Sequence, residues 1–109
     1  MLYQGIEYEK GQLHSSYKYK AYIPKSMWNA RRPDKIHRGQ YKIVSFGKPG
    51  YQQYYDKLGM WSKFNHHDKK RRSNYRARHG AIYININGES KLSYKVPYTK
   101  EWFSWNMLW

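Results

Sequence analysis

The sequence predicts an α+β fold: one small domain with short antiparallel strands or hairpins, one or two short helices, and an aromatic C-terminal tail. Several short stretches alternate apolar and polar residues, which is the period of a β-strand. Other stretches show helical spacing or helix-capping residues. A length of 109 residues suits a single domain over 1–109. Because aromatic residues make up 19% of the chain, we expect an aromatic core.

The first 40 residues combine one strand with basic, irregular sequence. Residues 17–23 alternate, and the predicted strand ends at Pro24. One face of this strand carries Tyr17, Tyr19, Ala21 and Ile23. Residues 25–40 lack a period and contain five basic residues, which favours a basic loop or extended arm. One interpretation of the whole stretch 1–40 is therefore an extended basic arm.

A second strand and a short helix are predicted next. Residues 41–46, "YKIVSF", have strand composition, and the glycines and proline of 47–50 end the strand in a turn. This strand can pair with residues 17–23. A helix over about 51–58 follows from the i, i+3, i+4, i+7 spacing of Tyr51, Tyr54, Tyr55 and Leu58.

The segment 64–80, "FNHHDKKRRSNYRARHG", predicts a helix over about 69–79. Asp68 or Asn65 can cap its first turn, since both side chains accept hydrogen bonds from main-chain N–H groups. Gly80 suits the left-handed position that often ends a helix.

Residues 81–96 predict a β-hairpin around Asn87–Gly88. A two-residue Asn-Gly turn would pair Ile84 with Lys91, and a three-residue loop would pair Ile84 with Leu92. Turn chemistry favours the first register and the match of apolar faces favours the second, which we expect.

The tail, residues 99–109, is too apolar to be left in water, so we expect it to dock on this domain or on another chain. Docking on a partner is an alternative because tryptophan anchors dominate interfaces. The candidate partner-docking residues are Trp102, Phe103, Trp105, Leu108 and Trp109.

The charge balance indicates a polyanionic or acidic partner. Lys and Arg number 21 against 7 Asp and Glu, which gives a net charge of +14. The absence of cysteine excludes disulfides and thiolate metal sites. No apolar run has the length of a signal peptide or a membrane span, so we expect a soluble intracellular protein.

The basic residues of the predicted helix are candidates for contact with phosphates or with a carboxylate-rich protein surface. Tyr75 lies between two cationic ridges and is the expected inward anchor, whereas the alternative is a merely solvated basic face. The candidate anion-binding or partner-binding residues of this helix are Lys69, Lys70, Arg71, Arg72, Arg76 and Arg78. Arg31 and Arg32, in the basic loop over 25–40, are further candidates.

The histidines of this segment predict a structural role. His66, Asp68 and His79, with Tyr75, are expected to support the helix through capping and, for a protonated His79, through the helix dipole. A metal site that also uses His67 is disfavoured because no ligand spacing appears and six cations lie nearby. The carboxylates are scattered, so we expect no catalytic residue, no metal, no cofactor and no enzyme.

Three blocks resemble an uncharacterised family of small basic proteins encoded by giant DNA viruses of algae and protists, the phycodnavirus and mimivirus relatives. The blocks are "FGKPGYQQYYD" at 46–56, a central pattern between 66 and 79, and "SWNMLW" at 104–109. The central pattern comprises His66, Asp68, Arg71, Arg72, Tyr75, Arg78 and His79. Residues 1–40 and 81–98 depart from the family.

The resemblance implies a viral origin and a role in the virion. Together with the charge and the aromatic tail, it leads us to expect a non-enzymatic structural protein, of minor capsid or cement type, that bridges larger virion proteins. Such a protein would be found in the virion and, during assembly, inside the host cell. The alternative is a sequence-nonspecific nucleic-acid-binding protein that condenses the genome on DNA or RNA phosphates.

Overall fold

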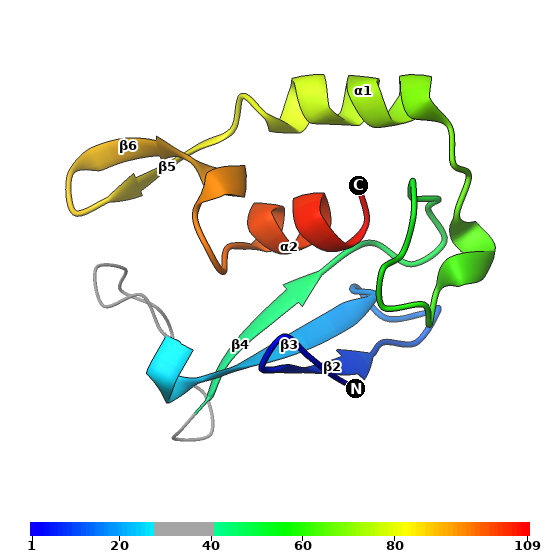
Figure 1. The fold of residues 1–109 in the computed structure, drawn as a ribbon, viewed down its shortest axis with the longest axis horizontal. Coiled ribbons are helices and arrows are strands. Elements are labelled where there is room, and N and C mark those ends of the chain that lie inside the picture. The colour runs from blue at the N-terminus through cyan, green and yellow to red at the C-terminus, as the bar shows by residue number, and fades with distance from the viewer. Residues whose placement is uncertain (28–40) are drawn as a thin grey trace. The chain divides into compact units, whose positions relative to one another are not determined.

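The computed structural model describes residues 1–27 and 41–109, and it confirms the α+β fold class (Figure 1). The chain divides into two compact units, Met1–Pro49 and Gly50–Trp109. Each unit is described by itself, and the one-domain expectation stays a prediction. Arg31 and Arg32 lie outside the described residues.

Unit 1 contains a four-stranded antiparallel sheet in the order β1-β2-β3-β4. The strands are β1 (Leu2–Tyr3), β2 (Ile6–Lys10), β3 (Tyr19–Pro24) and β4 (Tyr41–Phe46), and the short 3-10 helix η1 (Lys25–Met27) follows β3. The pairing of Ala21 with Val44 confirms that the predicted strands over 17–23 and 41–46 are partners.

One face of this sheet is mostly apolar and aromatic, with Lys42 buried opposite Ile23. Tyr19, Ala21 and Ile23 of β3 are fully buried, as the alternation predicts, whereas Tyr17 lies before the strand and is only partly buried. Phe46 stacks on Tyr19 with ring centroids 5.5 Å apart and meets Tyr8 edge-on at 6.2 Å. This face forms the core of unit 1.

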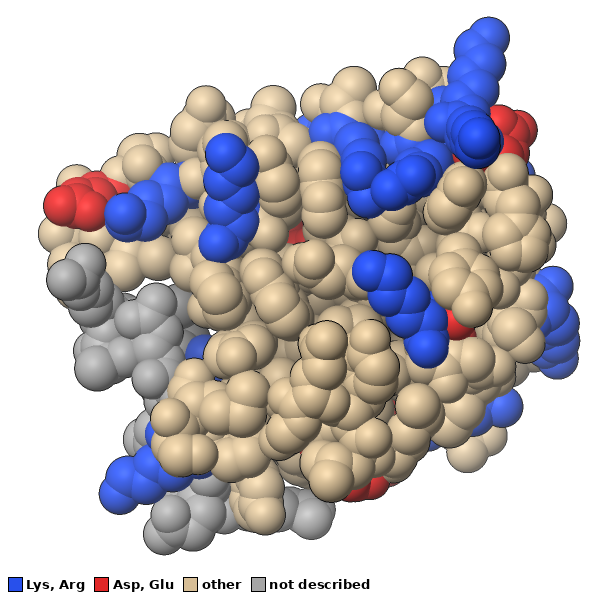
Figure 2. All heavy atoms as spheres, in the orientation of Figure 1, with Lys and Arg blue, Asp and Glu red and all other residues tan. Residues whose placement is uncertain are grey.

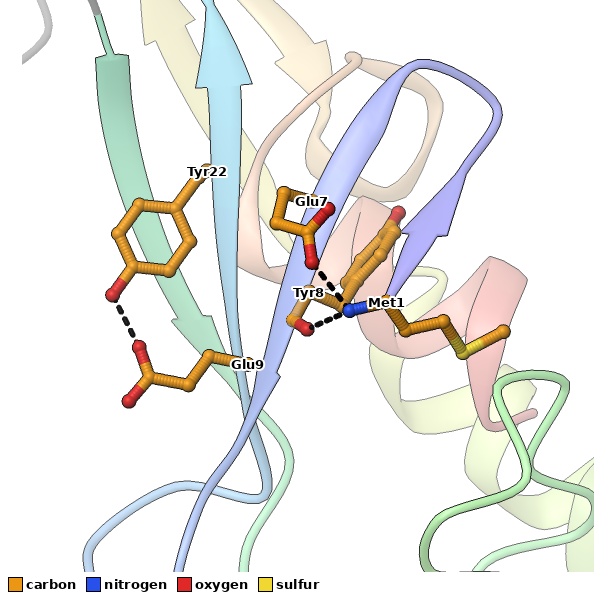
Figure 3. Close-up of polar contacts among 5 residues, drawn as sticks. All are labelled: Met1, Glu7, Tyr8, Glu9 and Tyr22. Carbon is orange, nitrogen blue, oxygen red and sulfur yellow. Dashed lines mark hydrogen bonds and ion pairs between the residues drawn. The ribbon is translucent and has the colours of Figure 1, made fainter.

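The extended-arm interpretation of 1–40 is wrong for residues 1–27, because β1 and β2 add to the sheet. In β2, Ile6 and Tyr8 are buried while Glu7 is exposed. Figure 3 shows the polar contacts of the outer face: the main-chain nitrogen of Met1 donates to the Tyr8 carbonyl at 2.9 Å and pairs with the Glu7 carboxylate. The Tyr22 hydroxyl donates to Glu9 across the β2–β3 pair.

Unit 2 holds both described α-helices. Its elements are η2 (Ser62–Phe64), α1 (Lys69–His79), β5 (Tyr83–Ile86), β6 (Glu89–Leu92), η3 (Ser93–Lys95) and α2 (Lys100–Met107). The predicted helix over 69–79 is confirmed as α1. The aromatic tail forms α2, whose first turn is capped by the Thr99 hydroxyl, which accepts from the main-chain N–H of Trp102 at 3.0 Å.

The predicted helix over 51–58 is wrong, because buried polar side chains fold this segment into turns. The Asp56 carboxylate accepts main-chain N–H bonds from Leu58 and Trp61, both at 2.8 Å. The main chain of Gln53 pairs with Phe64 and His66 instead of with a helical turn. Gln53 and Asp56 are buried while Tyr51 is exposed, so the helical spacing of the aromatics does not describe the buried face.

The β5–β6 hairpin is present, but the favoured register is wrong. Ile84 pairs with Lys91, which is the register of a two-residue turn. Asn87 and Gly88 both have positive φ, 51° and 86°, as a two-residue Asn-Gly turn of this kind requires. Because Ile86 alone is buried in β5, matching apolar faces adds little energy and turn chemistry decides the register.

Gly80 ends α1, but not in the predicted left-handed conformation: its φ is −71°. A Cβ atom at this position would lie 2.6 Å from the Arg76 carbonyl oxygen and 3.5 Å from the Trp105 ring. Glycine is therefore needed here for close approach. Within the described ranges, no helix combines the length and the apolar character needed to cross a membrane.

Candidate functional site

Asp68 caps the first turn of α1, and His66 binds the main chain of Asp68. The Asp68 carboxylate accepts from the main-chain N–H groups of Lys70 at 2.9 Å and Arg71 at 3.2 Å, so the predicted Asp68 cap is present. These N–H donors, Arg71 foremost, lower the pKa of Asp68. His66 Nδ1 in turn accepts from the Asp68 N–H at 2.9 Å, which fixes the residue before the helix.

The surroundings of His66 favour the neutral form of its imidazole. Burial and then the positive charge of Arg71 lower its pKa. Its Nε2 atom is buried and has no hydrogen-bond partner among residues 1–27 and 41–109. The ring lies 5.3 Å from the ring of Trp109. His66 therefore supports both the helix cap and the C-terminal segment.

Tyr75 anchors α1 to the segment that follows α2. Its ring stacks on Trp109 with centroids 4.2 Å apart and planes within 4°, and its other stacking partner is His79 at 4.0 Å. Burial is the largest cause that raises the pKa of Tyr75 to about 12. Figure 1 shows α2 running back alongside α1 within unit 2.

His79 stacks on Tyr75, with ring centroids 4.0 Å apart, at the C-terminal end of α1. Burial, followed by the positive charge of Arg78, lowers its pKa and favours the neutral imidazole. The contribution of a protonated His79 to the helix dipole is therefore disfavoured, and its stack on Tyr75 is the contact that the structure shows.

Arg72 and Arg76 both bind the main-chain oxygen of Trp109. Arg72 Nε donates at 2.9 Å and Arg76 Nη2 at 3.0 Å. The Arg72 guanidinium also lies 4.8 Å from the Tyr54 ring centre, and that of Arg76 lies 5.0 Å from the ring of Trp105. We call His66, Arg72, Tyr75, Arg76 and Trp109 the Trp109 cluster. From the sequence, both arginines were expected to be contact groups only.

The remaining basic residues of α1 face water. Arg71 Nη1 donates to the Gln52 side-chain oxygen at 2.7 Å. Figure 2 shows Lys and Arg side chains gathered over α1. We call the exposed cations the basic face, which consists of Lys69, Lys70, Arg71 and Arg78.

A small cavity opens on α1 beside the basic face. Its volume is about 280 Å³, and it is lined by Lys69, Arg72, Ser73 and Arg76, which share one helix face at i, i+3, i+4 and i+7. We call it the Lys69 pocket. No carboxylate lines it. Sequence reasoning missed Ser73, although its spacing from Lys69 and Arg76 could have placed it there.

Most of the aromatic tail is packed within the described structure. Phe103 and Leu108 were expected as candidate partner-docking residues. Both are buried in the structure, so their side chains are not exposed to a partner. Trp105 stacks on Tyr94 at 3.9 Å, and Trp102 meets Tyr98 edge-on at 5.1 Å. Trp102, Trp105 and Trp109 remain partly exposed. The tail thus docks largely within the chain.

The segments that carried the family resemblance meet around the Trp109 cluster. Tyr54 lies under Arg72, and the N–H of Tyr55 donates to the Leu108 carbonyl at 3.1 Å. Tyr75 and Trp109 stack directly. Many of the motif residues in unit 2 therefore have structural contacts, whereas Lys69, Lys70, Ser73, Asn74 and Arg78 are the more available polar groups of α1.

The basic face presents four exposed cations at the surface of α1. Within the described part of the chain, no three His, Cys, Asp or Glu side chains are grouped so as to hold a metal ion. Comparison of the chain with protein-family models, curated proteins and solved structures found no match.

Proposed function

We propose that the protein is a non-enzymatic nucleic-acid-binding protein that contacts phosphates through α1, independently of base sequence. The observation that supports this most strongly is the composition of α1, whose 11 residues include six Lys or Arg and no acidic residue. Four of these cations form the exposed basic face. Like charges on one helix repel each other, and a polyanion relieves that repulsion.

A phosphate backbone suits this surface better than scattered protein carboxylates. A helix of this length extends over about 16 Å at 1.5 Å per residue, and duplex DNA presents about one negative charge per 1.7 Å of its axis. Several phosphates therefore lie within reach of one basic face. Neutralising them releases counterions, which supplies the affinity without base contacts.

The test is binding of a labelled duplex followed by fluorescence anisotropy over a range of salt concentrations. We expect the logarithm of the association constant to fall linearly with the logarithm of salt, with a slope of about −0.9 per neutralised phosphate. Lys70→Gln and Arg78→Gln should each reduce the slope by about 0.9. Lys91→Gln is the matched control, because Lys91 already pairs with Glu89 at 3.5 Å on the hairpin. Undetectable or salt-independent binding would refute the proposal.

Our second candidate is a structural component of a virus particle, of minor capsid or cement type, that bridges larger virion proteins. The family resemblance supports it, and so do the partly exposed rings of Trp102 and Trp105, since tryptophan is common at the centre of interfaces. Mass spectrometry of purified particles tests it. Absence of the protein from those particles would remove this candidate and leave nucleic-acid binding untouched.

A further inference from the structure

The lining of the Lys69 pocket has the composition of a subsite for an anionic group. Its lining combines three cations and one hydroxyl, all of them hydrogen-bond donors. Pockets for drug-sized ligands usually measure about 300–1,000 Å³, and this one is slightly smaller at about 280 Å³. This volume admits a phosphate group, and the preference for an anion comes from the lining.

Two of the cations are held in place before any ligand arrives. Arg72 and Arg76 each bind the Trp109 main-chain oxygen and lie against an aromatic ring. These contacts use one donor atom of each guanidinium, and a guanidinium has five N–H donors. Binding therefore costs less side-chain entropy than it would with free arginines.

One residue of the pocket lining, Arg76, carries a charge and a donor that the described residues do not satisfy. Arg76 Nε is buried without a hydrogen-bond partner among the described residues. Burial and the nearby positive charge of Arg72 lower the pKa of Arg76, so the cation is disfavoured where it lies. An anion in the pocket would reduce both costs.

We propose that the Lys69 pocket binds a single phosphate group of a nucleic acid, with Arg72 and Arg76 as fixed donors and with Lys69 and Ser73 completing the site. This inference rests on the proposed function and adds a discrete position to it. The group can be a terminal phosphomonoester or a backbone phosphodiester, and the shared chemistry is a tetrahedral phosphate that accepts several N–H and O–H bonds.

The first experiment uses inorganic phosphate as the probe and the full chain as the protein. Titration is followed by NMR through the Arg76 Nε–H and Ser73 main-chain N–H signals. We expect both signals to shift and saturate. Ser73→Ala and Lys69→Gln should each weaken binding about tenfold, the usual effect of losing one hydrogen bond to a charged group. Lys70→Gln is the matched control, because Lys70 is equally exposed but does not line the pocket.

The second experiment compares a short single strand carrying a 5′-phosphate with the same strand carrying a 5′-hydroxyl. If Ser73→Ala weakens binding of the phosphorylated strand alone, the pocket takes terminal phosphates. If it weakens both strands equally, the pocket takes the backbone. Either result supports the subsite.

Two results would overturn the subsite. One is phosphate titration without saturable shifts at Arg76 Nε–H and Ser73. The other is equal weakening by Lys69→Gln and Lys70→Gln with no effect of Ser73→Ala, which would leave a diffuse basic face and the proposed function intact. Failure of the proposed function is distinguishable from failure of the subsite, because the unmodified chain would then bind no nucleic acid.

Discussion

Replacing Tyr75 by alanine tests whether the stack on Trp109 holds unit 2 together. Aromatic side chains bury about 150–250 Å² when fully enclosed, and Tyr75 is partly exposed, so we take a loss of about 100 Å². At about 25 cal/mol per Å², this burial contributes about 2.5 kcal/mol. The stack on Trp109 adds about 1 kcal/mol, and the better helix propensity of alanine offsets about 0.5 kcal/mol.

The free energy of unfolding should therefore fall by about 3 kcal/mol, measured by urea denaturation with tryptophan fluorescence and far-UV circular dichroism. Tyr75→Phe keeps the ring and should cost about 1 kcal/mol or less. The matched control is Tyr83→Ala, since Tyr83 is 64% exposed on β5 and its loss should cost under about 0.5 kcal/mol. Equal stability of Tyr75→Ala and Tyr83→Ala would contradict the anchoring role.

Three further predictions concern the ends of α1. Gly80→Ala should destabilise the protein by about 1–3 kcal/mol in the same urea assay, because its Cβ collides with the Arg76 carbonyl oxygen; unchanged stability would refute the close approach. The lowered pKa values of His66 and His79 mean that the unfolded chain binds protons first, so the melting temperature should fall as pH drops below about 6.5 and level off below the folded-state pKa values. His66→Gln and His79→Gln should each flatten this slope. Asp68→Ala should reduce the helical circular dichroism signal, while Asp68→Asn should retain most of it. The contribution of the Asp68 carboxylate to stability should disappear as pH falls below 3.8, the usual pKa of an aspartate, and through the lowered pKa of Asp68.

The elements governed by local chemistry could be predicted from the sequence. Asp68 is followed by residues with good helix propensity, so the start of α1 needs no tertiary information. The alternation of apolar and polar residues in 17–23 predicts a strand of a sheet that has one buried face. Asn87–Gly88 likewise specifies its turn, and the register prediction failed only because it gave apolar matching more weight than that turn.

The parts that failed depend on particular side-chain and main-chain contacts, most of them between residues well separated in sequence. Residues 51–58 have a helical pattern, but Asp56 and Gln53 bind main-chain groups 2 to 13 residues away. The binding of Arg72 and Arg76 to Trp109 spans 37 and 33 residues. No periodicity within α1 reveals that partner. For this reason the sequence indicated a basic site but could not separate its structural arginines from its available cations.

The Trp109 contact constrains the spacing of the C-terminal segment more than the identity of its last side chain. Arg72 and Arg76 bind a main-chain atom, which any residue at 109 would supply. Each residue of an α-helix advances the chain by about 1.5 Å and rotates it by about 100°. Deleting or inserting one residue within α2 would therefore carry this oxygen away from both guanidiniums, whereas substitutions on its partly exposed positions would leave it in place. We therefore expect related sequences to keep the number of residues between Thr99 and Trp109 even where their compositions diverge.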